Sequence, residues 1–270
     1  MLKSISFLLA FMFLGGTGPI ESDCESCATQ DHQYFCAFNT FAMNSRLCMD
    51  LTEVPSMVWK TFLKEMKTDH GIGSVEYNSN IPNFQLWEEI FPGMTSSTIS
   101  RMFMEEETFN LMPIVGVSYE QVLAFCKWRE KLLQKELDAM DPDMRANFPK
   151  KFIFRLPTNK EWARMRFMTQ DKKMLKKMDK MVEKNMKFFK AQKNDVINNS
   201  YRAGSIYQTK TDHLGLYNIF DNVAEMTADR GIAMGVSWNE ANEESKYDKE
   251  FTYQGAQAWL GFRCIFEIVE

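Results

Sequence analysis

Residues 113–128 read PIVGVSYEQVLAFCKW, and this stretch contains the start of a predicted helix. Ser118 precedes apolar residues that recur at helical spacing, and Glu120 in the first turn suits the positive end of a helix dipole. The apolar side of this helix consists of Tyr119, Val122, Leu123, Phe125, Cys126, Leu132 and Leu133. The stretch therefore predicts a helix with one apolar face in the middle of the chain.

The residues on either side predict further elements. Residues 37–66 indicate a strand, a turn and a helix that begins near Pro55, because proline needs no N–H partner in a first turn. Residues 67–112 are rich in Gly, Asn, Pro and Ser, which indicates long loops with short elements. From residue 215 onward we expect turns and short strands, with an acidic exposed loop at 239–250 and a final strand at 259–268.

Residues 158–161 (TNKE) form a capping-box pattern at the start of another helix. The Thr158 hydroxyl can accept a hydrogen bond from the backbone of Glu161, and the Glu161 carboxylate can accept one from the backbone of Thr158. Pro157 favours an extended chain before this cap. We interpret residues 155–158 (RLPT) as structural rather than catalytic, since local interactions explain their spacing.

The composition favours a folded, exported protein. The formal net charge of −4 argues against general nucleic-acid binding. Hydrophobic residues make up 45% of the 270 residues, which is enough for a sizeable core. Residues 1–18 predict a signal peptide, with Lys3 before an apolar run at 5–14 and small residues after it. Ten apolar residues are too few to span a bilayer, which needs about 20. A buried N-terminal helix is the alternative interpretation.

Six cysteines in an apparently exported chain indicate disulfides rather than metal thiolates. Four of them, Cys24, Cys27, Cys36 and Cys48, cluster around a Cys-containing N-terminal segment at residues 19–36. These four allow three pairings, among which the sequence does not choose, and a zinc site is the alternative.

A basic helix is predicted at about residues 170–194, where an apolar stripe is surrounded by lysines. Such a helix can lie on an anionic membrane or bind a partner, through side chains such as Lys176, Lys180, Lys184 and Lys187. The alternative is a solvated helix that packs one face on its own domain.

Six short blocks occur along the chain in a fixed order: residues 53–62, 113–128, 155–162, 215–226, 235–238 and 261–263. They read EVPS with Trp59 and Phe62, PIVGVSY with Cys126 and Trp128, RLPTNKEW, GLYNIFDNVAEM, GVSW and GFR. In this order they resemble the formylglycine-generating-enzyme (sulfatase-modifying-factor) domain family. The resemblance covers residues 37–270 and implies an α+β domain with much irregular structure, related to the C-type lectin-like fold.

The resemblance also implies a disulfide and a metal site. The family's bridge between its first conserved helix and its terminal GFRC block corresponds to Cys126 and Cys264. A bridge over a loop of this length would stabilise the fold by ~4–5 kcal/mol in the chain-entropy treatment. The family's calcium site corresponds to the backbone carbonyls of Phe220, Asp221 and Val223 and the side chain of Glu225. Oxygen donors in a tight loop suit Ca²⁺. A turn that is braced only by Asn222 and Glu225 is the alternative.

Catalysis is not expected from the resemblance. The family's oxidases bind copper(I) through a pair of cysteines between the fifth and sixth blocks, because soft thiolates suit this metal. Residues 236–260 contain no cysteine, so we expect no copper. The family's iron enzymes use histidines of an extra helical domain, and with only His32, His70 and His213 we expect no iron.

The sequence is most similar to exported Bacteroidota members of the family, some of which belong to gliding-motility and type IX secretion machinery. We therefore expect a non-catalytic interaction or scaffold component in the periplasm, on the outer membrane or at the cell surface. Its expected contacts are an envelope protein and, through the basic helix, a membrane surface, but not nucleic acid. The alternative is a metal-dependent oxidase or oxygenase of the same family with an unrecognised site.

Overall fold

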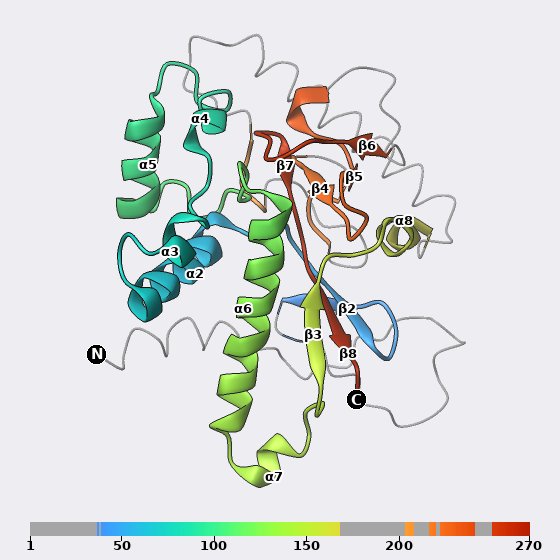
Figure 1. Ribbon diagram of the computed structural model, residues 1–270. Coiled ribbons are helices and arrows are strands. Elements are labelled where there is room, and N and C mark those ends of the chain that lie inside the picture. Colours follow the sequence, from blue (N-terminus) through green and yellow to red (C-terminus); the bar gives the residue numbers. More distant parts are fainter. Residues whose placement is uncertain (1–36, 38, 168–202, 208–215, 220–221, 241–249) are drawn as a thin grey trace.

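The computed structural model describes residues 37, 39–167, 203–207, 216–219, 222–240 and 250–270. In these residues, helices pack around two small sheets (Figure 1). The α+β class expected from the sequence is confirmed. The predicted signal peptide at 1–18, the cysteine segment at 19–36 and the basic helix at 170–194 lie outside the described residues.

The first sheet brings the two ends of the described chain together. Its order is β1 (Thr40–Ala42), β2 (Leu47–Asp50), β8 (Ile265–Ile268) and β3 (Phe152–Arg155), and all neighbouring pairs are antiparallel. The C-terminal strand β8 therefore lies between β2 and β3, which leaves β3 at an edge of this sheet.

The second sheet has the order β6 (Phe251–Thr252), β5 (Ile232–Met234), β4 (Ala224–Met226) and β7 (Leu260–Gly261). Strands β4 and β7 are parallel, whereas the other pairs are antiparallel. The single final strand predicted at 259–268 is wrong, because β7 and β8 belong to different sheets. The three residues between them, Phe262 to Cys264, carry the chain from one sheet to the other.

Seven helices lie in the described residues: α2 (Ser56–His70), α3 (Val75–Asn78), α4 (Phe84–Trp87), α5 (Ser96–Glu105), α6 (Tyr119–Asp138), α7 (Pro142–Arg145) and α8 (Asn159–Phe167), besides the 3-10 turn η1 (Trp238–Glu240). The helix predicted after Ser118 is confirmed as α6, and Ser118 and Gln121 form its capping box. The helix predicted near Pro55 is α2. The ten-residue helix α5 was not predicted, because three serines, a threonine, an arginine and a glutamate dilute its apolar pattern of Ile99 and Phe103.

The capping box predicted at the start of α8 is confirmed. The Glu161 amide donates to the Thr158 hydroxyl over 3.1 Å, and the Thr158 amide donates to the Glu161 carboxylate over 2.8 Å. Arg155 of β3 also binds this carboxylate with two nitrogens at 2.7 Å. The RLPT sequence therefore joins β3 to α8, which is the structural role that we expected.

Aromatic side chains form the centre of the larger core. Trp59 of α2 stacks on Phe125 of α6 with ring centres 5.2 Å apart, and Phe262 lies edge-on to Phe125 at 5.5 Å. All three are almost completely buried. Burial of each such ring contributes roughly 2–3 kcal/mol, so this contact explains why residues 113–128 and the terminal GFRC block pack together.

Gly116 allows the chain to turn just before α6. Its φ is +70°, and a Cβ there would lie 2.9 Å from the Asn83 carbonyl oxygen and 3.0 Å from the indole nitrogen of Trp87. A side chain at this position would therefore be both strained and blocked. The close approach lets Trp87 donate to the Val115 carbonyl over 2.9 Å.

Candidate functional site

A buried polar centre lies where β4 and β7 run in parallel. Their register sets Glu225 beside Gly261, and Arg263 follows two residues later. The side chains of Arg263 and Glu225 are 0% and 1% exposed. Two guanidinium nitrogens of Arg263 bind the Glu225 carboxylate, with Nη2–Oε1 at 2.6 Å and Nε–Oε2 at 2.7 Å. Such a bidentate pair is the strongest form of ion pair in proteins.

The remaining donors of Arg263 bind three backbone carbonyls. Nη1 donates to Asp50 and Leu51 over 3.1 and 3.2 Å, and Nη2 donates to Tyr217 over 3.0 Å. Burial would lower the pKa of Arg263, but the adjacent Glu225 carboxylate outweighs it, so the pKa is raised and the guanidinium stays charged. Arg263 thus joins β2, β4 and the C-terminal segment.

Glu53 is a second buried carboxylate in this centre. It is 0% exposed and accepts hydrogen bonds from the side-chain amides of Asn218 and Asn222, both over 3.1 Å. These asparagines adopt positive φ angles of 50° and 68°, which asparagine tolerates better than most residues. Burial raises the pKa of Glu53 well above its usual value; Arg263 opposes this shift, whereas the negative charge of Glu225 adds to it.

The calcium site implied by the family falls partly on this centre. Phe220 and Asp221 lie outside the described residues, and Val223, two residues before Glu225, is buried. Both oxygens of Glu225 accept hydrogen bonds, from Arg263 and from the indole of Trp162 over 2.8 Å. The Glu225 side chain does not fit a calcium ligand in this arrangement, because Ca²⁺ would face the guanidinium charge. Calcium binding at this turn stays a prediction.

Cys126 and Cys264 form a second buried contact between α6 and the C-terminal segment. Their sulfur atoms lie 3.7 Å apart as thiols, and the side chains are almost fully buried. Burial raises the pKa of the Cys264 thiol well above its usual value. The predicted disulfide is untested, and oxidation would need these sulfurs to approach to about 2.05 Å. Cys48 is disulfide-bonded. The other three predicted disulfide cysteines, Cys24, Cys27 and Cys36, lie outside the described residues.

An ion pair next to these thiols joins the same elements. Arg129 of α6 binds the Asp50 carboxylate with Nη1 and Nη2 at 2.7 and 2.8 Å, and Asp50 also accepts from the Cys264 amide over 2.8 Å. The Arg129 guanidinium lies 4.4 Å from the centre of the Phe154 ring, within cation–π range. Each charged side chain described in this centre and next to it has a hydrogen-bond partner inside the domain, so we interpret these residues as structural.

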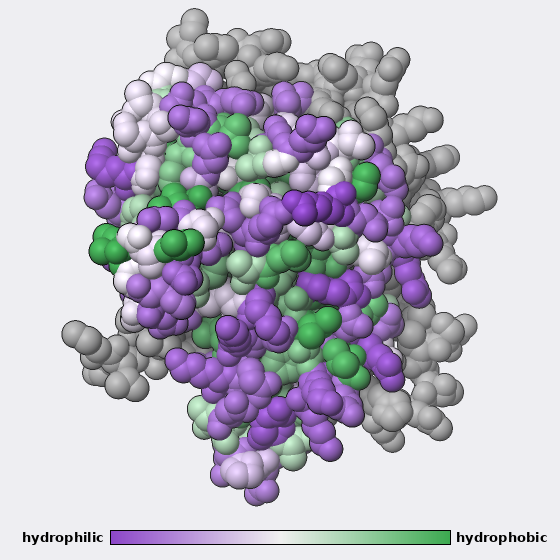
Figure 2. Space-filling model, in the orientation of Figure 1, coloured by the Kyte–Doolittle hydropathy of each residue, from purple (hydrophilic) through white to green (hydrophobic). Residues whose placement is uncertain are grey.

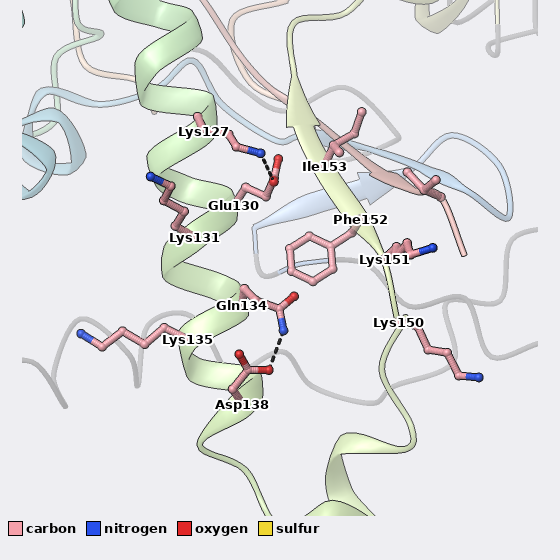
Figure 3. A pocket seen from close by; sticks show the side chains of 11 residues that line it. Lys127, Glu130, Lys131, Gln134, Lys135, Asp138, Lys150, Lys151, Phe152 and Ile153 are labelled. Carbon is pink, nitrogen blue, oxygen red and sulfur yellow. Dashed lines mark hydrogen bonds and ion pairs between the residues drawn. The ribbon is translucent and has the colours of Figure 1, made fainter.

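An open surface lies on the other side of α6. We name it the α6–β3 groove; it is lined by Lys127, Glu130, Lys131, Gln134, Lys135 and Asp138 of α6, by residues 150–153 and by Val269 (Figure 3). Two polar pairs lie along it, Lys127 with Glu130 and Gln134 with Asp138. The groove was not predicted from the sequence. The recurrence of Lys127, Lys131 and Lys135 every four residues was the available signal.

The lysines predicted to form an interaction surface, Lys176, Lys180, Lys184 and Lys187, lie outside the described residues. Among the described residues, no helix is both long and apolar enough to cross a membrane. Within the same residues, no three side chains of His, Cys, Asp or Glu are grouped as a metal site requires.

The fold and its closed polar centre define an α+β domain whose sequence blocks contribute to its two buried clusters. The model of the sulfatase-modifying factor enzyme 1-like domain matches residues 16–268, so the chain belongs to this family, as its sequence blocks predicted. The affiliation with gliding-motility and type IX secretion proteins stays a prediction.

The other comparisons add little to this assignment. A search of curated proteins finds no match. Treponema denticola variable protein 1 is similar over 82% of this chain and 84% of its own, at 16% identity and a TM-score of 0.40. The crystal structure of CarF is similar over 83% of this chain and 87% of its own, at 14% identity and a TM-score of 0.41.

Proposed function

We propose that this chain is an exported, non-catalytic member of its family that acts as an interaction component of the cell envelope. The observation that carries the proposal is the absence of cysteine from residues 236–260, where the family's oxidases hold copper. The two free cysteines of the described residues, Cys126 and Cys264, are buried inside the domain. A substrate thiol could not approach a metal at that position without opening the core.

The chemistry of these two thiols supports the same proposal. A thiolate is the form that binds copper, and a raised pKa keeps the Cys264 sulfur protonated at neutral pH. The polar centre offers no alternative, since Arg263 and Trp162 already occupy the Glu225 carboxylate. The sequence blocks shared with the family thus serve to hold the fold.

The finer part of the proposal concerns the place of action. The signal-peptide pattern supports export to the periplasm, the outer membrane or the cell surface. The similarity of PIVGVSYEQVLAFCKWRE to exported Bacteroidota proteins supports a role in gliding motility or type IX secretion. The basic pattern at 170–194 supports contact with a partner or an anionic membrane.

A copper titration tests the non-catalytic part. The reduced protein is titrated with copper(I) against a colorimetric chelator, and oxygen uptake is followed with a cysteine-containing peptide as substrate. We expect no copper-dependent oxygen uptake, and the same copper binding in wild type and in Cys126→Ala/Cys264→Ala. Stoichiometric copper with oxygen consumption would overturn the proposal.

The second candidate is a metal-dependent oxidase of the same family. The observation that favours it is the pair of free thiols 3.7 Å apart, since two close sulfurs are suitable ligands for copper(I). The double alanine variant separates the candidates, because loss of bound copper together with oxygen uptake in this variant would assign the oxidase to Cys126 and Cys264.

Crosslinking in the envelope tests the interaction part. A photo-activated amino acid is introduced at exposed positions around the described domain, and envelope fractions are analysed after irradiation. We expect one partner that is crosslinked reproducibly from neighbouring positions. Absence of any such partner from every position would count against an interaction component.

A further inference from the structure

Strand β3 has a free edge. The Lys151 amide donates to the Glu270 carbonyl, and the Val269 amide donates to the Lys151 carbonyl, both over 2.9 Å, so the backbone of Lys151 faces β8. Backbone groups alternate in direction along an antiparallel strand. Ile153 and Arg155 therefore also face β8, whereas the N–H and C=O groups of Phe152 and Phe154 face away from it. Within the described residues, no hydrogen bond joins these outward groups to a partner.

The free edge lies beside the α6–β3 groove. Figure 3 shows β3 running alongside α6, with the side chain of Phe152 directed toward the helix. Ile153 and the half-exposed Val269 add apolar surface to the groove. The surface between the two elements is open in this view, with hydrophobic patches bordered by hydrophilic ones (Figure 2). A chain that entered the groove would meet unpaired backbone groups and apolar side chains together.

The charges of the groove select for an acidic occupant. Its lining contains five lysines but only two acidic residues, Glu130 and Asp138, which pair with Lys127 and Gln134. Lys131, Lys135 and Lys150 form no ion pair with a described residue. Lysines at the rims attract a negative partner and speed its association. They also repel a second copy of this groove, so pairing of two β3 edges is unfavourable.

Strand β3 and the lysine-bearing segment of α6 have similar lengths. The four residues of β3 extend over about 13 Å at the usual rise of a strand. The α6 segment from Lys127 to Lys135 extends over about 12 Å at the usual rise of a helix. A segment of about four to six extended residues would therefore reach the whole edge and remain next to the lysines.

We propose that the α6–β3 groove binds an extended, acidic segment of a partner protein, which adds a strand to the edge of β3. This inference rests on the proposed interaction function and names its surface. The backbone of the segment bonds to Phe152 and Phe154, as in other recognition by strand addition. Its carboxylates lie near Lys131, Lys135 and Lys150, and its alternate apolar side chains contact Ile153 and Val269.

Synthetic ten-residue peptides test the proposal on the full exported chain. The first alternates valine with glutamate, the second alternates valine with lysine, and the third has the first sequence with an N-methyl group on every residue, which removes the N–H donors from both edges of the strand. We expect the first peptide to bind at least tenfold more tightly than either control. The N-methylated peptide keeps the charge but cannot complete the strand, so equal binding of the first and third peptides would overturn the proposal.

Amide hydrogen exchange gives a residue-level signature. The amides of Phe152 and Phe154 should exchange rapidly in the free protein and at least tenfold more slowly with the acidic peptide. The amides of Ile153 and Arg155 already bond to β8 and should change little. Uniform protection along β3, or none, would contradict strand addition.

Two charge variants locate the binding surface. Lys131→Glu/Lys135→Glu should weaken binding of the acidic peptide at least fivefold. The matched variant Lys64→Glu/Lys67→Glu, at exposed positions of α2, should not weaken it. Binding to anionic phospholipid vesicles without peptide binding would overturn this inference. A partner that is crosslinked only from another face would overturn the groove proposal but not the proposed interaction function. Copper-dependent oxidation would contradict the proposed function itself.

Discussion

The polar centre and the α6–β3 groove differ in how their charged groups are buried and paired. In the polar centre, Arg263 and Glu225 are almost fully buried and every charged atom of the pair has a partner. In the groove, lysines are exposed and the outward backbone groups of β3 have no partner among the described residues. The first arrangement stabilises the fold, because a buried charge must be paired. The arrangement in the groove leaves lysines and backbone groups available to another molecule, and in the free protein solvent screens the lysine charges.

The difference separates the residues that hold the fold from those that the proposed binding function would use. Blocks that are typical of the family, such as GFRC and GLYNIFDNVAE, meet in the buried region. The groove is built from the α6 residues from Lys127 onward, most of which follow the family block at 113–128, and from the edge of β3. Substitutions in the two regions should therefore separate stability from binding, and the following changes are ordered from the largest expected effect to the smallest.

Removing Arg263 should have the largest effect. Arg263→Met leaves the Glu225 carboxylate buried without its cation, so we expect a loss of ~3–5 kcal/mol in the free energy of unfolding, measured with urea. Arg263→Met/Glu225→Gln should recover part of this loss, because the buried charge is gone. Arg230→Met breaks an ion pair whose partners are 70% and 59% exposed, and it should cost under ~1 kcal/mol. Equal losses for the two single variants would remove the contrast.

Glu53 should make stability depend on pH. Its pKa is raised in the folded protein, so between the unfolded value of about 4.3 and the folded value only the folded state holds the proton. The stabilising effect is complete below pH ~4.3 and is lost as pH rises through the folded pKa, by up to ~1.4 kcal/mol per pH unit.

Glu53→Gln removes this titration. The side-chain amide that this substitution introduces also faces an asparagine amide, which adds an offset that does not vary with pH. We therefore expect the difference in unfolding free energy between wild type and variant to change with pH above ~4.3. Glu76→Gln, at an exposed position, is the control for removal of a carboxylate. A flat difference for Glu53→Gln would show that folding does not raise the pKa of Glu53.

The half-buried pair of Arg155 and Glu161 should have an intermediate effect on stability, and this effect should vary with pH in the direction opposite to that of Glu53. Hydrogen bonds from Arg155 lower the pKa of Glu161 to about 2, so its stabilising effect is present above pH ~4.3 and is lost as pH falls toward 2. Glu161→Gln should cost about 1–2 kcal/mol at pH 7, after allowance for solvent screening, and almost nothing at pH 2. Glu105→Gln, in a pair 57% and 65% exposed, is the control and should cost under ~0.5 kcal/mol.

The lysines of the groove should have the smallest effect on stability. Lys131→Glu/Lys135→Glu changes exposed side chains without an ion-pair partner in the described residues, so the free energy of unfolding should stay within ~0.5 kcal/mol of wild type. Thermal unfolding monitored by circular dichroism checks this value. A larger loss would mean that the groove lysines stabilise the fold. The peptide and hydrogen-exchange experiments on the wild-type chain would then test the binding surface.

Local patterns in the sequence predicted several elements correctly. The start of α6 at Ser118, the cap at Thr158 and the start of α2 near Pro55 are confirmed, because each depends on residues within one helical turn. The prediction for 259–268 was wrong, because nothing local shows that Phe262 to Cys264 carry the chain from one sheet to the other. Helix α5 was missed for a related reason: its buried Phe103 packs against Phe84 and Trp87 on another element, which the local pattern does not show.

The sequence by itself determined the family, the α+β class and the helix caps, since these depend on the order of short blocks and on neighbouring residues. Only the tertiary structure decided that Glu225 pairs with Arg263, that Glu53 is buried and that Lys131 lies beside a free strand edge. These contacts join residues that are far apart in the chain. Their energies depend on burial and on geometry, which arise only when the sheets and helices have packed.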